Sequence, residues 1–142
     1  MTLPVSTLAL LDTSAYTVSR RSKAAQKKIQ ALALNGMLAT FVTVDLELGY
    51  SARNATEHAG IRRVRAALIQ LPSIDAIAQR AREVQTLMAD RGHHRAAGIV
   101  DLLTAAAGEH YGAAVVHYDA DFDHIATVTG QTVKWIVPQG SA

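Results

Sequence analysis

The sequence predicts an α/β fold, a three-layer α/β/α sandwich with a mostly parallel central sheet of four to five strands. Short apolar runs alternate with longer segments of helical periodicity along the 142 residues. These runs are continuously apolar, which is typical of parallel strands covered on both faces. No internal repeat, linker or low-complexity segment divides the chain, so we expect one domain over residues 1–142.

The first half opens with a predicted buried strand at residues 8–11, where the sequence reads Leu-Ala-Leu-Leu. A helix with a basic face is expected over 22–34, because Asn35 and Gly36 follow as stop signals. Residues 38–42 form a second apolar run and a second strand. Two further helices are then expected, over 44–53 and 57–71. In the second of these, three side chains have core spacing: Val64, Leu68 and Leu71.

The second half continues the alternation. A short strand is expected near 73–74, then a helix over 75–90 that ends before Gly92. Its buried stripe is predicted to contain Ile77, Ala81, Val84, Leu87 and Met88. An alanine-rich helix from about 99 to 111 should lead into a strand at 113–117. A brief helix near 122–127, with Phe122 in the core, and a last strand at 133–137 complete the prediction.

Five carboxylates lie in apolar or strand-like surroundings at the ends or beginnings of these elements: Asp12, Glu47, Asp101, Asp119 and Asp121. A buried carboxylate is costly unless something compensates its charge. The carboxyl ends of parallel strands meet at one edge of a sheet, where ligands bind. We therefore expect these acids to share a pocket in which a divalent cation compensates them.

Each acid also has a purely structural interpretation. Asp12 could cap the turn that follows its strand, and Asp101 could be an ordinary acid at a helix start. Glu47 could be an ordinary first-turn acid that the helix dipole favours. Asp45 suits that role better, because residues two apart point to nearly opposite helix faces and only one of the two can face the pocket. Asp119 and Asp121 are both common in turns. The metal-site hypothesis leads because all five occur at expected element boundaries.

The net charge of +2 arises from 14 Lys and Arg against 12 Asp and Glu. Without the five candidate acids the surplus rises to +7, and an acidic pocket in a basic surface suits a polyanion such as RNA. Each basic residue taken singly is more simply a solvated side chain. The candidate RNA contacts are Arg20, Arg21, Lys27, Lys28, Arg91 and Arg95.

The absence of cysteine excludes disulfides, thiolate zinc sites and a cysteine nucleophile. The six histidines show no paired helical spacing that would indicate zinc. No apolar run approaches the roughly 20 residues of a membrane helix, and the first residues lack the basic start of a secretory signal. We expect a soluble, cytoplasmic protein that does not enter a membrane.

Four fragments in this order resemble the PIN-domain nucleases, and most specifically the VapC-type toxins of toxin-antitoxin pairs. The fragments are LLDTSAY, VDLELGYSAR, GIVDLLTAAAGEHYGA and VVHYDADFDHIA. The resemblance covers essentially the whole chain. It implies that Asp12, Glu47, Asp101 and Asp119 hold metal, with Asp121 as a supporting acid. Ser14 matches a polar position that often follows the first aspartate.

The resemblance further implies a Mg²⁺- or Mn²⁺-dependent endoribonuclease, inhibited by a small antitoxin protein and usually a homodimer, with tRNA or rRNA as the expected substrate. Three alternatives stay open at this point. A haloacid-dehalogenase-like phosphotransfer enzyme needs a second carboxylate two residues after Asp12, where Ser14 stands. A receiver-like module needs a lysine after a late strand, and Lys134 instead begins its strand. A non-catalytic PIN-like binding module would be expected to lack one of the acids.

Overall fold

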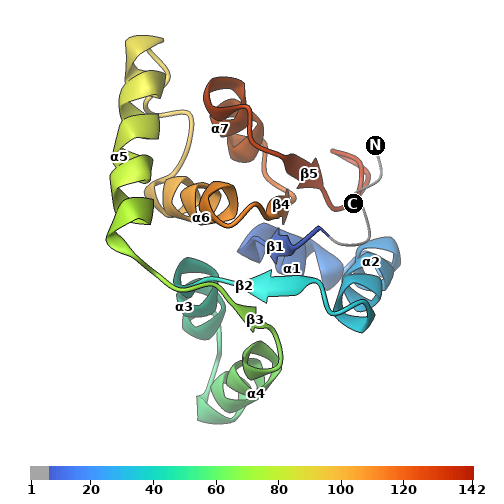
Figure 1. The fold of residues 1–142 in the computed structure, drawn as a ribbon. Coiled ribbons are helices and arrows are strands. Elements are labelled where there is room, and N and C mark those ends of the chain that lie inside the picture. Colours follow the sequence, from blue (N-terminus) through green and yellow to red (C-terminus); the bar gives the residue numbers. More distant parts are fainter. Residues whose placement is uncertain (1–6) are drawn as a thin grey trace.

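The computed structural model describes residues 7–142 and shows a five-stranded, fully parallel sheet in the order β3-β2-β1-β4-β5 (Figure 1). The strands are β1 (Ala9–Leu11), β2 (Leu38–Thr40), β3 (Ile69–Gln70), β4 (Ala114–His117) and β5 (Val133–Trp135). The central strand β1 pairs with β2 and β4, so that Leu10 lies opposite Ala39 and Val115. All carboxyl ends therefore meet at one edge.

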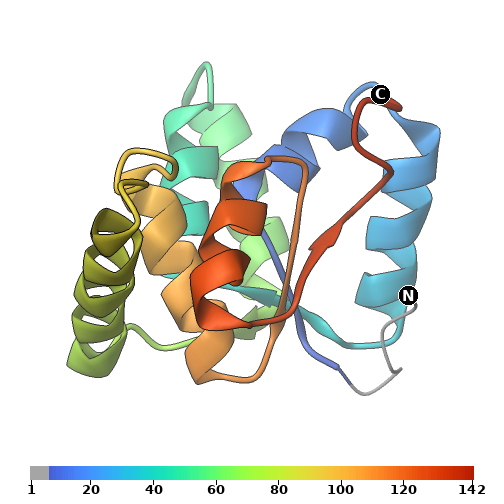
Figure 2. The same ribbon diagram turned by 90° about the horizontal axis from the view of Figure 1, so that it is seen from above.

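Seven helices are found in the described residues: α1 (Thr13–Ser19), α2 (Lys23–Leu34), α3 (Val42–Tyr50), α4 (Ala55–Ala66), α5 (Asp75–Asp90), α6 (Ile99–His110) and α7 (Asp121–Thr129). Helices α1 and α2 lie on one side of the sheet and α5, α6 and α7 on the other (Figure 2). Two buried apolar clusters fill the spaces between these layers. The predicted three-layer α/β/α sandwich is confirmed.

The strands alternate between the two clusters as their two-residue period requires. Leu10 and Val115 pack with the cluster of α5, α6 and α7, whereas Leu11 and Val116 pack with that of α1 and α2. Helix α6 lies very close to β4. A Cβ atom built on Gly108 would lie 2.6 Å from Val115 Cγ2, so this contact requires glycine. The close packing fixes α6, which carries Asp101, relative to the sheet.

The region around the third strand differs from the prediction. Helix α4 ends at Ala66 rather than continuing to Leu71, and the strand expected near 73–74 is β3 at Ile69–Gln70. Ile69 pairs with Ala39 of β2, so a non-local contact overrides the helical spacing of the local sequence. Val64, predicted to be in the core, is 63% exposed, whereas Leu71 is buried.

Other predicted elements are confirmed with small shifts of their ends. Helix α5 matches its predicted bounds and Phe122 is fully buried, although Leu87 of the predicted stripe is 40% exposed. Helix α1, which starts directly after Asp12, was not predicted. The expected absence of a secretory start concerns in part residues 1–6, which lie outside the described residues. Within residues 7–142, none of the helices combines the length and apolar character needed to cross a bilayer.

Candidate metal centre

Four of the five predicted acids lie at the carboxyl edge of the sheet. Asp12 follows β1 and caps helix α1, and Asp119 follows β4. Asp121 is the first residue of α7, and Asp101 lies in the first turn of α6. Because β1 and β4 are adjacent parallel strands, the loops that follow them emerge side by side.

Asp101, Asp119 and Asp121 form the centre of this cluster. Each offers a carboxylate oxygen, and these three oxygens all lie within 4.8 Å of one another. All three residues are partly buried. The turn that carries two of them is ordered by the backbone, because the Asp121 N–H donates to Asp119 Oδ1 at 2.9 Å. This hydrogen bond has the form of an Asx turn and fixes the backbone between the two acids.

Asp12 lies beside this trio and is almost completely buried, with 3% of its surface exposed. Its Oδ2 accepts a hydrogen bond from the Ser14 N–H at 2.9 Å, while its Oδ1 has no partner among the described residues. A buried carboxylate oxygen without a partner is costly. The charge of Asp12 raises the pKa of both Asp101 and Asp119, so the Asp12 carboxylate lies within electrostatic reach of these two acids.

The crowding of carboxylates perturbs their ionisation. Burial, then the charge of Asp12 and contact with the Asp121 carboxyl, raise the pKa of Asp101 to about 8. Burial also raises the pKa of Asp119, and repulsion from Asp121 and Asp12 adds to this, whereas the Asp121 N–H acts in the opposite direction. Without a cation, the cluster therefore retains a proton at neutral pH.

Glu47 is held differently from the other four acids. Its Oε1 accepts a hydrogen bond from the Thr13 hydroxyl at 2.9 Å, which ties α3 to the start of α1 next to Asp12. It is not one of the three residues whose oxygens converge. The neighbouring acid Asp45 instead accepts from the Thr40 hydroxyl at 2.5 Å and faces away, into a groove described below.

Several hydroxyl groups brace the helices around the cluster. The Tyr118 N–H donates to Ser14 Oγ at 2.9 Å, which joins the turn after β4 to α1. The hydroxyls of Thr43 and Thr104 lie 2.6 Å apart and link α3 to α6. Sequence analysis named only Ser14 among these. Hydroxyl residues one to four positions from a candidate acid were the available signal, since Thr13, Thr43 and Thr104 all meet that criterion.

The residues present fit a hard divalent cation. Mg²⁺ and Mn²⁺ prefer oxygen ligands, and the site offers carboxylate oxygens with no competing thiolate or imidazole in the trio. A cation would compensate the unsatisfied Asp12 oxygen and the repulsion that raises the pKa of Asp101. The arrangement can therefore hold a metal ion at an exposed edge of the sheet, where a polyanion can approach.

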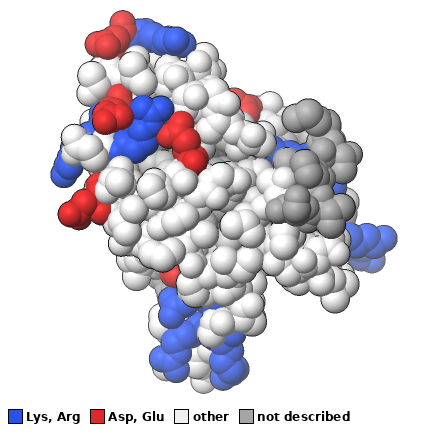
Figure 3. Space-filling view, viewed as in Figure 1, with Lys and Arg blue, Asp and Glu red and all other residues white. Residues whose placement is uncertain are grey.

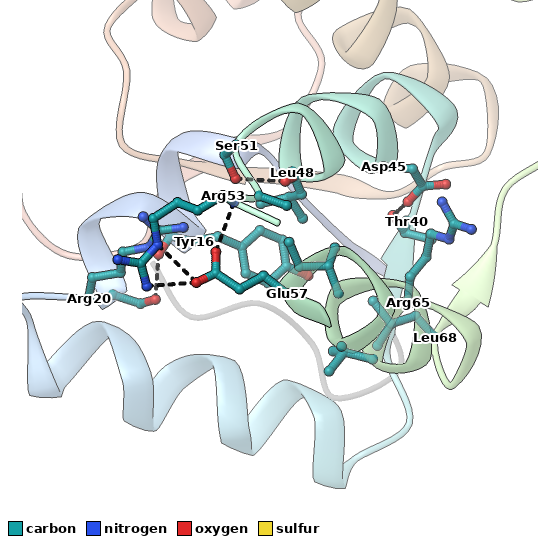
Figure 4. A pocket seen from close by; sticks show the side chains of 15 residues that line it. Tyr16, Arg20, Thr40, Asp45, Leu48, Ser51, Arg53, Glu57, Arg65 and Leu68 are labelled. Carbon is teal, nitrogen blue, oxygen red and sulfur yellow. Dashed lines mark hydrogen bonds and ion pairs between the residues drawn. The ribbon is translucent and has the colours of Figure 1, made fainter. Parts of the chain in front are cut away.

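A separate groove of about 790 Å³ lies between α1, α3 and α4 (Figure 4). Its apolar side chains are Tyr16, Leu48, Ile61, Val64 and Leu68. An ion pair between Arg53 and Glu57, 2.6 Å long, lies at its rim. None of the five predicted acids lines this groove in the described part of the chain. The two acids of the groove, Asp45 and Glu57, are paired with Thr40 and Arg53, whereas the carboxylates of the acidic cluster converge on one another.

Basic side chains gather in a place that sequence analysis did not name. Figure 3 shows Lys and Arg side chains concentrated over α4, at the bottom of that view. Arg62 and Arg63 of this helix are exposed, and Arg65 is partly buried beside the groove. Of the predicted RNA contacts, Arg91 and Arg95 are exposed in the loop that leads into α6 and Asp101.

Comparison with known proteins identifies the family. The model of the PIN domain matches residues 9–128. Ribonuclease VapC51 of Mycobacterium tuberculosis is 47% identical over 136 residues, which cover 93% of this chain and 95% of the relative. Ribonuclease VapC21 of the same species is 39% identical over 97% of this chain and its own full length.

Solved structures agree with this at the level of the fold. The crystal structure of DNA-bound VapBC from Salmonella typhimurium has a chain that matches with a TM-score of 0.71 and 16% identity, covering 92% of this chain and 99% of that one. The VapBC2 structure from Rickettsia felis, bound to a promoter DNA fragment, matches with a TM-score of 0.69 and 18% identity, over 90% and 98% of the two chains. The sequence matches and the shared parallel fold lead to one conclusion: this chain belongs to the PIN-domain family, and ribonucleases of the VapC type resemble it over nearly its whole length.

Proposed function

We propose that this protein is a divalent-metal-dependent endoribonuclease and the toxin of a toxin-antitoxin pair, and that it hydrolyses RNA phosphodiester bonds. One observation carries the proposal. Three carboxylates converge within 4.8 Å beside a buried Asp12 oxygen that lacks a partner in the described residues. The names of the VapC relatives support RNA as the substrate. The site of action is then the cytoplasm, where the RNA lies.

In this proposal Asp12, Asp101, Asp119 and Asp121 hold the metal, and Glu47, which accepts from the Thr13 hydroxyl next to Asp12, is the fifth acid of the site. Bound Mg²⁺ or Mn²⁺ supplies the positive charge that orients a water molecule and stabilises charge on the scissile phosphate. A bound cation would offset the repulsion that raises the pKa of Asp101, so Asp101 would bind it as the ionised carboxylate. The hydrogen bond from Thr13 keeps Glu47 directed toward the first turn of α1.

The proposed substrate is a structured RNA such as tRNA or rRNA. The exposed Arg91 and Arg95 precede α6, which carries Asp101, so they are candidates to contact RNA phosphates next to the acidic cluster. Each phosphate contact that is lost should lower the salt dependence of RNA binding by about one unit of the log–log slope. The double variant Arg91→Gln/Arg95→Gln should therefore bind tRNA more weakly and with a shallower slope.

The deciding experiment incubates the purified full chain with tRNA in the presence of Mg²⁺ or Mn²⁺, with and without chelator. We expect metal-dependent internal cleavage that is lost in Asp101→Asn and kept in Asp75→Asn, which neutralises an exposed acid in the first turn of α5. Cleavage that persists in the presence of chelator and in the Asp101→Asn variant would indicate a contaminating nuclease and would contradict the proposal.

We further propose that a small antitoxin, encoded beside this protein, seats an apolar segment in the groove between α1, α3 and α4. The support is the apolar lining next to arginines, which fits a segment with apolar and acidic side chains. Val64→Glu should abolish co-purification with that antitoxin. Leu34→Glu is the matched control, because Leu34 is 88% exposed on α2, outside the groove. Equal retention of the antitoxin by both variants would contradict this assignment.

Homodimer formation, which the family resemblance implies, is checked by light scattering of the purified chain.

A further inference from the structure

His117, the last residue of β4, is a fully buried polar side chain two residues before Asp119 of the acidic cluster. Its imidazole packs between two aromatic rings, with centroid distances of 5.0 Å to Phe122 and 4.9 Å to Trp135. Sequence analysis gave this histidine no role. A buried imidazole two residues from Asp119 requires an explanation, because burial of a polar ring is costly unless its nitrogens are used.

Only one ring nitrogen makes a hydrogen bond within the described chain. His117 Nδ1 accepts the N–H of Asp119 at 3.1 Å, so this nitrogen carries no proton. The proton of the neutral ring is then on Nε2, which is buried and has no hydrogen-bond partner among residues 7–142. Asp123 Oδ1 lies 3.9 Å from Nε2, and Asp123 Oδ2 accepts from Trp135 Nε1 at 3.0 Å. This nearby carboxylate favours the proton on Nε2.

Two successive hydrogen bonds connect the imidazole to the acids. The Asp119 N–H donates to His117 Nδ1, and Asp119 Oδ1 accepts from the Asp121 N–H at 2.9 Å. Both have the form of an Asx turn, in which a side-chain acceptor binds the N–H two residues later. The first of these turns fixes the direction in which the chain leaves β4, and the second fixes Asp119 relative to Asp121.

We propose that His117 is a positioning residue for the metal centre, which acts through its unprotonated Nδ1 by orienting the Asp119–Asp121 turn. This inference rests on the proposed metal-dependent function. It differs from a purely packing role, in which the ring would matter only as a filler between Phe122 and Trp135. The two roles make opposite predictions for two amide substitutions.

Asparagine and glutamine separate the roles because their amides occupy different places. The Oδ1 of His117→Asn takes the place of Nδ1 and keeps the acceptor, although Asn leaves a larger void. Gln fills the volume better, but its amide reaches the Nε2 position and leaves the Asp119 N–H without its acceptor. A positioning role therefore ranks Asn above Gln, and a packing role ranks Gln above Asn. His117→Leu removes both nitrogens and serves as the third variant.

The measurement is Mn²⁺ binding to the full chain by calorimetry, with circular dichroism and Trp135 fluorescence to verify folding. We expect His117→Gln and His117→Leu to weaken Mn²⁺ binding by about 10- to 100-fold, as is usual for groups that orient metal ligands. His117→Asn should retain most of the affinity. Equal affinities in folded variants, or a higher affinity in Gln than in Asn, would overturn the inference. Failure of the wild-type chain itself to bind Mn²⁺ would refute the proposed metal site, and the positioning role with it.

A second measurement needs no variant. The ¹⁵N shifts of the His117 ring in the wild-type protein should show an unprotonated Nδ1 and a protonated Nε2 at neutral pH. The opposite tautomer would overturn the inference even if all substitutions unfold the protein, because a protonated Nδ1 cannot accept the Asp119 N–H.

Discussion

Substitution of Asp101 by asparagine should make the metal-free protein more stable at neutral pH while it abolishes RNA cleavage. Asp101 is the acid whose ionisation is opposed most clearly by its surroundings, since burial and the neighbouring carboxylates raise its pKa to about 8. In the unfolded chain the pKa of aspartate is about 3.9. Asparagine has nearly the same shape and never ionises, so Asp101→Asn keeps the packing and removes the cost of protonating this carboxyl group on folding.

The sign of this stability change follows from the number of protons that the folded and the unfolded chain bind. Between about pH 4 and pH 8 the folded protein retains a proton at Asp101 that the unfolded chain has lost, so its free energy of unfolding falls as pH rises through this window. One pKa unit corresponds to about 1.4 kcal/mol, which sets a ceiling of about 4 kcal/mol at pH 7. Solvent reaches this carboxyl and screens its neighbours, so we expect a gain of about 1–2 kcal/mol for Asp101→Asn.

Denaturant unfolding in chelator at pH 5, 7 and 8 measures this gain. The advantage of Asp101→Asn over the wild type should grow from pH 5 to pH 8. Asp75→Asn is the control, because it neutralises an exposed acid on α5 and its effect should not change over this range. The electrostatic interpretation of the cluster would be refuted by a variant that is no more stable than the wild type at pH 8, or by an advantage that is the same at pH 5.

Three further predictions concern the same edge of the sheet. Mg²⁺ or Mn²⁺ should raise the melting temperature of the wild type, because a free ion concentration of 100 times the dissociation constant stabilises the folded state by about 2.7 kcal/mol. Thermal scans of Asp12→Asn should show no such rise, and an unchanged rise would exclude Asp12 as a ligand. Asp119→Asn should lower cleavage of tRNA more than Asp121→Asn, because Asp119 belongs to the trio and its side chain also accepts the Asp121 N–H that orders the turn; equal losses would contradict that ranking. Ser14→Ala should lower the free energy of unfolding by about 1–2 kcal/mol, because the Tyr118 N–H loses its acceptor, and a neutral effect in denaturant titrations would show that water replaces it.

The sequence was sufficient for most of the architecture. Continuous apolar runs such as residues 8–11 indicate strands buried on both faces, and helix stop signals such as Gly92 place helix ends. Where a local pattern was ambiguous, the prediction was wrong. The spacing of Val64, Leu68 and Leu71 fits a helix, yet Ile69 pairs with β2. A two-residue strand at a sheet edge has too little local signal to compete with a helical period.

The sequence alone also determined which residue types could form the site. An aspartate that follows an apolar strand is costly to bury, and it lies at the carboxyl edge of a parallel sheet. Only the tertiary structure decided how these acids divide. Asp101, Asp119 and Asp121 converge, Asp12 lies buried beside them, and Glu47 is held through Thr13. The same holds for His117, whose Nδ1 and Nε2 have different surroundings. These features depend on contacts between α1, α3, α6 and the turn after β4, residues up to about a hundred positions apart, and no local pattern encodes the direction in which a side chain points across such a distance.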